Sequence, residues 1–437
     1  MFKTVRDAFR IKEIRHRVFY VLLALVVIRA GSQIPVPGVD ASFFSQYFAQ
    51  NANDAFAFLN AFTGGGFSNF SILALGITPY ITASIIVQLL TIAIPKLEEM
   101  AKEGPDGRKK LEKVTRALNI ILSIVESVAM CIGFGNQLLL EMNFLNVVTV
   151  VATLTAGSAF LMWIGEQITD KGVGNGISMV LLINILSRIP ADMITLHENF
   201  AAGKTIARAA LAWIIIAVVI VFVVVLVLIL NGATRKIPVQ YSKKMVGRRM
   251  MGGQSSHIPL KVNTAGVIPI IFASSIMSFP SIIIGFTGKS ATGFWGRVLS
   301  CLSSSNWFDP NNWLPTIGVV IYILLVVFFA YFYTSITFNP MEVSNNLKKQ
   351  GGFIPGIRPG APTTEYLNEM LKYIIFIGAA GLCIVAIIPF IFNGVFNASV
   401  SFGGTSLIII IGSVTLETIK QVESMMLVRN YKGFLND

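Results

Sequence analysis

An uncharged run of eighteen residues, 213–230, constrains the fold more than any other feature of this sequence. A helix rises ~1.5 Å per residue, so about 20 apolar residues cross a hydrocarbon core of ~30 Å. Lipid offers no hydrogen bonds to the backbone, so a run of this kind is stable in a membrane only as a helix or in a closed barrel. The run therefore predicts a transmembrane helix.

Composition extends this prediction to the whole chain. Hydrophobic residues make up 54% of the sequence and charged residues 13%, whereas a soluble domain carries about 25% charged residues. We therefore expect an all-α integral membrane protein. We expect neither a disulfide framework nor a metal cluster, because the cysteines and histidines are scattered and form no CxxC pair. They are Cys131, Cys301, Cys383, His16, His197 and His257.

Ten apolar segments are long enough to be membrane spans. They cover residues 18–34, 72–94, 118–134, 147–165, 176–189, 209–230, 265–286, 314–338, 373–392 and 405–428. The fifth is short, and the tenth is apolar on one side only after Leu416, so we expect protein to shelter both. The first run leads into Pro35 and Pro37 without a small-residue cleavage pattern, so we interpret it as a true span.

The basic residues predict the orientation of the spans. With the N-terminus in the cytoplasm, ten spans place most Lys and Arg on the inner side and return the C-terminus to the cytoplasm. The outer segments then hold only Arg188, Lys204, Arg208, Lys289 and Arg297. The net charge of +12 is thus mostly a consequence of topology, and nucleic-acid binding is not needed to explain it.

An internal repeat relates the second and seventh expected spans. Residues 79–86 and 269–276 both fit P-x-I-x-A-S-x-I. With ten spans the two segments run in opposite directions, which indicates an inverted repeat of two five-span halves, 1–190 and 191–437. Chance similarity between apolar helices is the alternative. Each match starts with a proline that invites a kink, and small residues that permit close packing follow.

The repeat would bring Ile81 and Ile271 together at the centre of the molecule. A constriction of aliphatic side chains can seal a pore by close packing and binds no particular solute. Ordinary helix packing is the alternative for these isoleucines. Just before the second span, Gly64, Gly65 and Gly66 form a permissive backbone segment flanked by Phe62 and Phe67. That segment could close a channel from the outside, or it could be a plain outer loop.

Three polar residues lie in or beside the spans. An ionisable group at the membrane centre costs ~2.5–3.5 kcal/mol on insertion scales. Glu126 lies in the third span, Gln88 in the second, and Asn263 just before the seventh. These side chains could form a polar latch between the three helices, although Glu126 could equally make a structural hydrogen bond. Arg29, near the outer end of the first span, could snorkel.

Two inner loops are long. Loop 232–262 carries seven Lys or Arg residues, and loop 339–366 is rich in glycine and proline around Arg358. Rigid basic protrusions suit a large anionic partner such as ribosomal RNA. Anionic lipid alone would account for the charge, though not for the length of the loops.

At this point the chain resembles the SecY family, which forms the channel of the bacterial protein translocase. The resemblance covers essentially the full length. It is carried by IPVPGVD (34–40), ILALGITPYITASIIVQLLT (72–91), FLMWIGEQITDKGVGNGIS (160–178), SSHIPLKVNTAGVIPIIFASSI (255–276), FNPMEVSNNLKKQGGFIPGIRPG (338–360) and FGGTSLIIII (402–411).

The resemblance implies two five-helix halves around an hourglass pore. It implies a pore ring of Ile77, Ile81, Leu181, Ile271 and Ile409, with leucine at 181 where isoleucine is common in the family. It implies a plug at about 62–71, including Phe62, Gly64, Gly65, Gly66, Phe67 and Ser68. It implies a lateral gate with Thr82, Gln88, Glu126, Asn263 and Phe279. Contacts with the motor and the ribosome fall at Lys243, Arg248, Arg249 and Arg358.

The implied partners are the membrane subunits SecE and SecG, the SecA motor ATPase, the ribosome, and signal sequences and nascent polypeptides. The implied location is a bacterial plasma membrane. A secondary transporter is the main alternative, because such proteins also use inverted repeats, but it would need converging charges at the midplane. Neither Gly203-Lys204 nor Gly288-Lys289 has the upstream glycine of a P-loop. We therefore expect no enzymatic activity and no cofactor.

Overall fold

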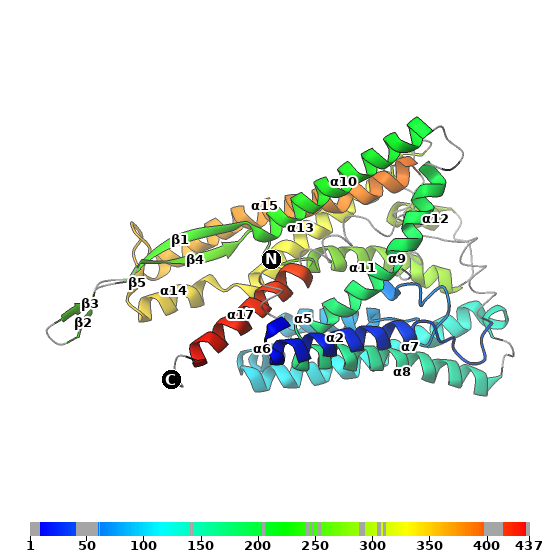
Figure 1. Ribbon diagram of the computed structural model, residues 1–437, viewed down its shortest axis with the longest axis horizontal. Coiled ribbons are helices and arrows are strands. Elements are labelled where there is room, and N and C mark those ends of the chain that lie inside the picture. Colours follow the sequence, from blue (N-terminus) through cyan, green and yellow to red (C-terminus); the bar gives the residue numbers. More distant parts are fainter. Residues whose placement is uncertain are drawn as a thin grey trace.

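The computed structural model of the chain describes residues 9–40, 60, 62–139, 141, 143–200, 202, 206–241, 244–246, 249–251, 255–287, 293–303, 307–308, 312–396 and 414–433. The protein is mostly helical, with long helices lying roughly side by side (Figure 1). The first group of helices is α2 (Lys12–Gly31), α5 (Thr78–Ala93), α6 (Pro95–Lys102), α7 (Pro105–Leu138), α8 (Phe144–Lys171) and α9 (Gly176–Phe200). The second group is α10 (Ile206–Gly232), α11 (Ile268–Thr287), α12 (Phe294–Leu302), η2 (Leu314–Thr316), α13 (Ile317–Thr337), α14 (Pro340–Lys349), α15 (Ala361–Phe396) and α17 (Leu416–Gly433).

Six helices among the described residues are long and apolar enough to cross a membrane. They coincide with six of the ten expected spans and lie in α7, α8, α9, α10, α13 and α15. The pair α5 and α6, bent by 103° at their junction, would make a seventh. The helices α2 and α11 overlap the first and seventh expected spans, and most of the apolar part of the tenth lies outside the described residues.

Two expected span boundaries and the expected proline kinks were wrong. The second span starts as a helix at Thr78, because residues 72–77 form turns in which Gly76 has φ +60°. The fifth span is not short, since α9 has 25 residues and continues through Pro190. A proline removes one intrahelical hydrogen bond without ending the helix here.

The prolines of the repeat, Pro79 and Pro269, are each the second residue of their helix. They start α5 and α11 instead of kinking them, since the N–H groups of the first turn have no intrahelical acceptor.

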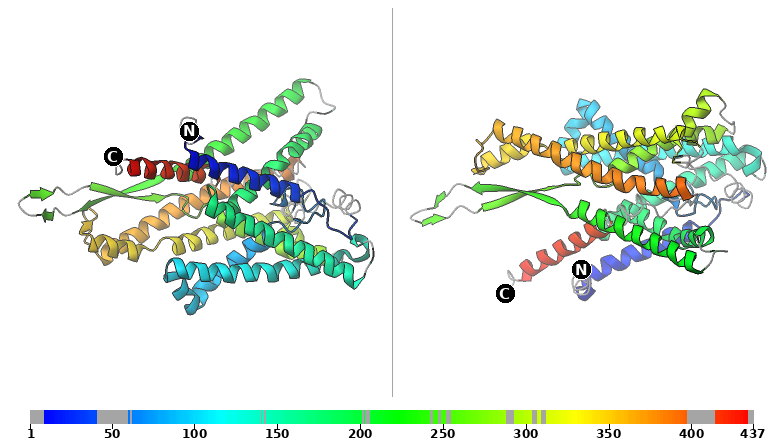
Figure 2. Two further views of the ribbon diagram at one scale, coloured as in Figure 1. Left: turned by 60° about the horizontal axis from the view of Figure 1, so that its bottom comes forward. Right: turned by 90° about the horizontal axis from the view of Figure 1, so that it is seen from above.

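The expected all-α class holds for the bulk of the chain, which is mostly helical, but the two long inner loops meet in a small β-sheet that was not expected. Strands β1 (Thr234–Tyr241), β4 (Ser255–Lys261) and β5 (Gly352–Phe353) pair in the order β4–β1–β5. The register pairs Gln240 with both Ser255 and Phe353. A second hairpin, β2 (Lys244–Val246) and β3 (Arg249–Met251), lies at the tip. The β1–β4 hairpin projects well beyond the helices (Figure 2).

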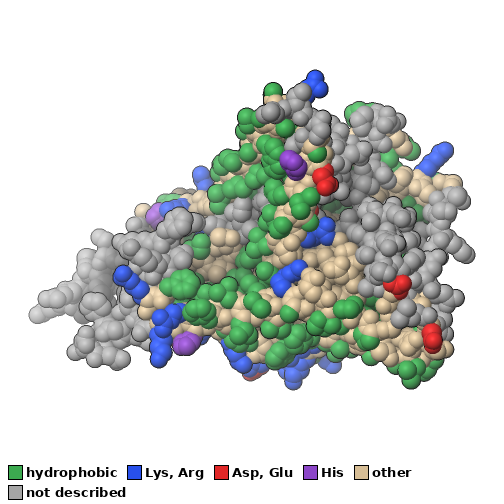
Figure 3. Space-filling model, turned by 45° about the vertical axis from the view of Figure 1, so that its right-hand side comes forward, with side chains coloured by type: hydrophobic (Ala, Val, Ile, Leu, Met, Phe, Trp, Pro, Cys, Tyr) green, Lys and Arg blue, Asp and Glu red, His purple; other side chains and the backbone are tan. Residues whose placement is uncertain are grey.

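The largest buried cluster joins both halves of the chain. It gathers side chains from α2, α5, α8, α9, α10, α11, α13 and α15. Large apolar side chains also cover the outside, for example Val218 at 61% and Ile214 at 62% exposure on α10. Hydrophobic side chains spread over much of the face in Figure 3. An exterior of this kind is suited to lipid and unsuited to water.

Candidate functional site

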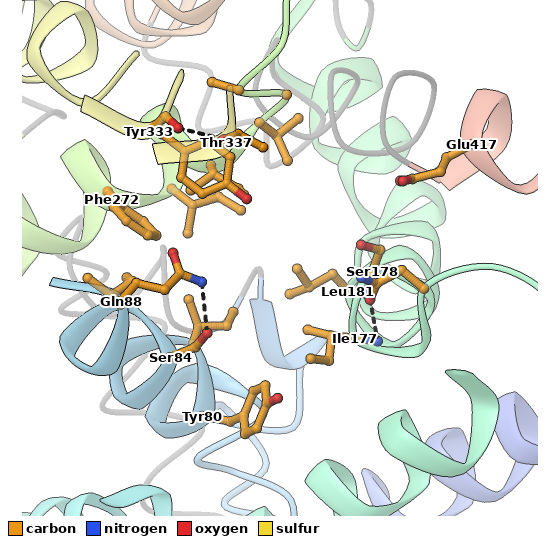
Figure 4. A pocket seen from close by; sticks show the side chains of 18 of the residues that line it. Tyr80, Ser84, Gln88, Ile177, Ser178, Leu181, Phe272, Tyr333, Thr337 and Glu417 are labelled. Atoms are coloured by element: carbon orange, nitrogen blue, oxygen red, sulfur yellow. Dashed lines mark hydrogen bonds between the residues drawn. The ribbon is translucent and has the colours of Figure 1, made fainter. Parts of the chain in front are cut away.

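A cavity of about 400 Å³ lies where helices of both halves converge. Side chains of α5, α9 and α11 line it, together with Tyr333 and Thr337 of α13 and Glu417 of α17. In Figure 4, Tyr80, Ser84 and Gln88 face Ile177, Ser178 and Leu181 across the open space. Polar and aliphatic groups are mixed, and Glu417 is the one charged residue in the described lining.

Three of the five expected ring residues line this cavity, and a fourth lies in the apolar cluster beside it. Ile81, Leu181 and Ile271 line it, and they come from three different helices. Ile77 precedes the first residue of α5 and is 1% exposed in the same apolar cluster. Ile409 lies outside the described residues. Ile81, Leu181 and Ile271 thus line one cavity, although they lie far apart in the sequence.

The expected plug segment, 62–71, is packed at two places. Phe62 belongs to the central cluster that contains the ring residues. Phe67, 1% exposed, packs instead in a second cluster formed mainly with α7 and α8. Gly64 and Gly65 adopt φ of +63° and +88°, a conformation that favours glycine. The Ser68 hydroxyl donates to the Gly65 carbonyl at 2.9 Å, and Gly66 lies within the turn that this bond closes.

The expected polar latch does not form among the described residues. Gln88 Nε2 donates to Ser84 Oγ of its own helix at 3.3 Å. Asn263 Nδ2 donates to Asn231 Oδ1 at the end of α10 at 2.9 Å. Glu126 is half-buried on α7 and bonds to neither of them. Each amide finds a nearer partner, so the latch hypothesis was wrong for this conformation.

The other expected gate residues, Thr82 and Phe279, lie on α5 and α11, the two helices that carry the internal repeat. The Thr82 hydroxyl donates to the Thr78 carbonyl within α5 at 3.1 Å. Phe279 belongs to α11. Among contacts between the two halves, those of α11 with α7 are the most extensive in the described part of the chain. The third span, α7, therefore takes part in the contact between the two halves that the sequence had assigned to the second span, α5, and the seventh span, α11.

The expected motor and ribosome contacts fall on the projecting sheet and beside it. Arg249 is in β3, and Arg358 is exposed in the turn between β5 and α15. Its carbonyl accepts a hydrogen bond from Thr363 Oγ1 at 2.8 Å, which holds the turn. Lys243 and Arg248 lie outside the described residues. The β1–β5 pairing was not predicted, although the alternating burial of Ile237 and Val239 is typical of a strand.

Asn184 and Ser187 of α9 were also missed as candidate residues. Asn184 Nδ2 donates to the Phe62 carbonyl at 2.7 Å, and Arg29 Nη1 donates to the Gly64 carbonyl at 3.0 Å. An asparagine inside an apolar span was the signal that could have identified this contact. Within the described residues, no group of three or more His, Cys, Asp or Glu side chains is placed to hold a metal ion.

Comparisons with known proteins agree on one family. The sequence profile of the SecY family matches residues 71–419. The protein translocase subunit SecY of Halalkalibacterium halodurans is 44% identical over the full length of both chains. That of Corynebacterium glutamicum is 40% identical, with 98% of this chain and 99% of the relative covered.

Solved structures share the fold. One described as a protein conducting channel superimposes with a TM-score of 0.63, covering 96% of both chains at 18% identity. Sec61 in the canine ribosome–channel complex superimposes with a TM-score of 0.55 at 17% identity, again with 96% of both chains covered. With its profile match, its full-length relatives and its fold, the chain belongs to the SecY family.

Proposed function

We propose that this chain is the protein-conducting channel of a translocase, which passes unfolded secretory proteins across a membrane and releases transmembrane segments sideways into it. One observation carries the proposal: Ile81, Leu181 and Ile271, from helices of both halves, line one cavity and share an apolar cluster with the plug residue Phe62. The full-length relatives are named protein translocase subunits. A solved neighbour is described as having a plug domain that maintains a membrane seal.

The aliphatic ring accounts for both closing and passage. Its side chains offer no fixed polar ligand, so in the closed state they pack and exclude water, and around a translocating chain they act as a gasket. Ile77 and Phe62, which belong to the same apolar cluster, deepen the seal. The ring accepts any sequence because the contacts are apolar and non-directional.

The lateral exit lies between α5 and α11, with α7 beside them. A signal sequence in the cavity exposes its apolar face to lipid, which stabilises each central Leu, Ile, Val or Phe by ~0.3–0.6 kcal/mol. Partitioning of the segment separates the helices. Thr82, Gln88, Glu126, Asn263 and Phe279 form the gate residues in this mechanism.

Ten spans in two inverted halves, 1–190 and 191–437, complete the proposed topology. The bias of Lys and Arg supports cytoplasmic termini and a bacterial plasma membrane. The projecting sheet and the exposed Arg358 then face the cytoplasm, where they meet the SecA motor and the ribosome. Two solved neighbours are described as bound to a ribosome. SecE and SecG are the proposed membrane partners.

A secondary transporter finds no support. The described lining of the cavity carries one carboxylate, Glu417, and neither Lys nor Arg. A transporter site needs converging charges or unwound backbone groups near the midplane.

Reconstitution tests the proposal. The chain, with SecE and SecG, is placed in liposomes with SecA, ATP and a signal-bearing precursor, and protease protection of the precursor is measured. We expect ATP-dependent protection that Arg358→Glu abolishes and that Lys372→Glu, a charge reversal on α15, leaves in place. No protection, in a folded preparation that binds its partners, would contradict the proposal.

A further inference from the structure

The N-terminal end of the plug segment (62–71) is held through its backbone by side chains of two other helices. Asn184 Nδ2 on α9 donates to the Phe62 carbonyl at 2.7 Å. Arg29 Nη1 on α2 donates to the Gly64 carbonyl at 3.0 Å. These helices pack against each other, so the two donors approach the segment from one continuous support.

We propose that Arg29 and Asn184 form a restraint that holds the plug segment closed and sets how readily it opens. The inference rests on the proposed channel function, and it assigns a role to two residues outside the ring, the plug and the gate. Because both donors bind carbonyl groups, the restraint does not depend on the side chains of the plug segment.

Ser187 is a weaker third contact. Its hydroxyl lies 3.3 Å from the Gly64 carbonyl but 2.7 Å from the Asn184 carbonyl one turn earlier. A hydroxyl has one proton, and the shorter distance favours the bond within the helix. The restraint therefore depends mainly on Arg29, whose hydrogen bond is charge-assisted, and on Asn184.

Gly64 fits this contact because it lacks a side chain. A Cβ there would lie 2.8 Å from Arg29 Nη1, from the Asn184 backbone and from Ser187 Oγ. The φ of +63° is a second reason for glycine. The close approach of the carbonyl to its donors thus needs glycine at this position.

Burial makes the contact costly to break. Asn184 is 2% exposed, and its Oδ1 has no hydrogen-bond partner among the described residues. When the Phe62 carbonyl leaves, the amide loses its bond inside an apolar cluster, and an unpaired buried donor is strongly unfavourable. The cost of leaving the Asn184 amide without this hydrogen bond therefore favours the closed position of the plug segment.

The two ends of the plug segment are held differently, which suggests the order of opening. At the C-terminal end, Val36 N–H donates to the Phe70 carbonyl at 3.0 Å, and Ile72 N–H donates to the Ile34 carbonyl at 2.9 Å. Phe67 is buried beside this ladder. In the described part of the chain, side chains of α2 and α9 tie the 62–64 end to other helices, so we infer that this end releases first, while the far end stays attached.

Asn184 also connects the restraint to the ring. Leu181, which lines the cavity, lies three residues earlier on α9, and residues three apart share a helix face. A chain that displaces Leu181 therefore also displaces the Asn184 amide from the Phe62 carbonyl. Entry of a substrate and release of the plug segment are coupled through one helical turn.

Hydrogen exchange measures the restraint without relying on channel activity. The amides of Gly65, Gly66 and Ser71 donate to carbonyls nearby, so they exchange only when the segment opens. In nanodiscs with the full chain, Asn184→Leu and Arg29→Met should each speed exchange across 62–71 at least about tenfold. Ser187→Ala should speed it about twofold to threefold.

Asn119→Leu is the matched control. Asn119 is a fully buried asparagine on α7, and its side-chain hydrogen bonds among the described residues go to Met162 and Ser158 of α8 and not to the plug segment. It should leave exchange in 62–71 unchanged. Arg29→Lys keeps the charge and should give an intermediate rate, which separates hydrogen-bond geometry from charge.

Single-channel recording completes the test. If the restraint and the channel function both hold, Asn184→Leu also raises the frequency of spontaneous openings severalfold. Faster exchange without any conductance would support the restraint and contradict the channel function. Unchanged exchange in both Asn184→Leu and Arg29→Met, in folded preparations, would overturn the restraint.

Discussion

The two repeat helices α5 and α11 share a sequence pattern but are packed differently. The positions that follow the proline, Tyr80 to Thr82 in α5, are half-buried, whereas the equivalent Ile270 to Phe272 in α11 are buried. Phe272 packs edge-to-face against Phe329 of α13 with ring centroids 5.4 Å apart. The hydroxyl of Thr82, its equivalent, donates to the Thr78 carbonyl of its own helix.

This difference indicates which side of the gate moves. An element with few buried contacts opens at lower cost than one fixed by a packed core. Phe272 anchors α11 to α13, whereas the residues that follow the proline of α5 are only half-buried, and α5 ends in a bend of 103° into α6. We infer that α5 is the moving side and α11 the fixed side.

The largest expected effect is the loss of stability when Phe272, which packs α11 against Phe329 of α13, is replaced by alanine. Phe272→Ala should lower the free energy of unfolding by about 3–5 kcal/mol, because the variant leaves a cavity against Phe329. Thr82→Ala should change it by less than about 0.5 kcal/mol. Denaturant titration of both variants in the same detergent measures the difference. Equal effects would contradict the asymmetry between the two helices.

The next largest expected effect is ion leakage through the closed channel when the ring residues Ile81 and Ile271 are replaced. Replacing Ile81 and Ile271 by glycine removes two side chains that close the cavity, and we expect the closed channel to leak ions at least about tenfold more. Of the single variants, Ile271→Gly should leak more, since Ile271 is 7% exposed and Ile81 is only partly buried. Conductance in planar bilayers measures both, and conductance unchanged in the double variant would show that another constriction seals the pore.

The packing asymmetry should also appear in the unaltered protein. Amides of 81–90 in α5 should exchange about tenfold faster than those of 271–277 in α11 at equal intrinsic rates. Hydrogen exchange in nanodiscs followed by mass spectrometry gives both values from one sample. Slower exchange in α5 would reverse the assignment of the moving side.

The sequence predicted the membrane class and six of the spans because each depends on local pattern, and the repeat singled out Ile81 and Ile271, which line one cavity. The full pore ring was implied by the family resemblance and stays a prediction. Apolar length predicts a span, and a repeated motif predicts equivalent helices. Side-chain partners were less predictable, because they depend on how helices pack. Glu126, Gln88 and Asn263 were expected to meet, yet two of them bond elsewhere. The β1–β5 pairing joins residues more than a hundred positions apart, which no local pattern indicates.

The smallest expected effect is a difference in stability between variants of Asn263 and Gln88, the two amides of the proposed latch. Asn263→Leu removes the bond to Asn231, which links the start of the α11 segment to the end of α10, so it should cost about 1 kcal/mol of stability. Gln88→Leu removes only a 3.3 Å bond within α5 and should cost less than about 0.5 kcal/mol. Denaturant titration compares them, with Ser84→Ala as a control for the Gln88 bond. If Gln88→Leu proved the more damaging, α5 would be held in place by a contact outside its own helix, and it could not be the looser side of the gate.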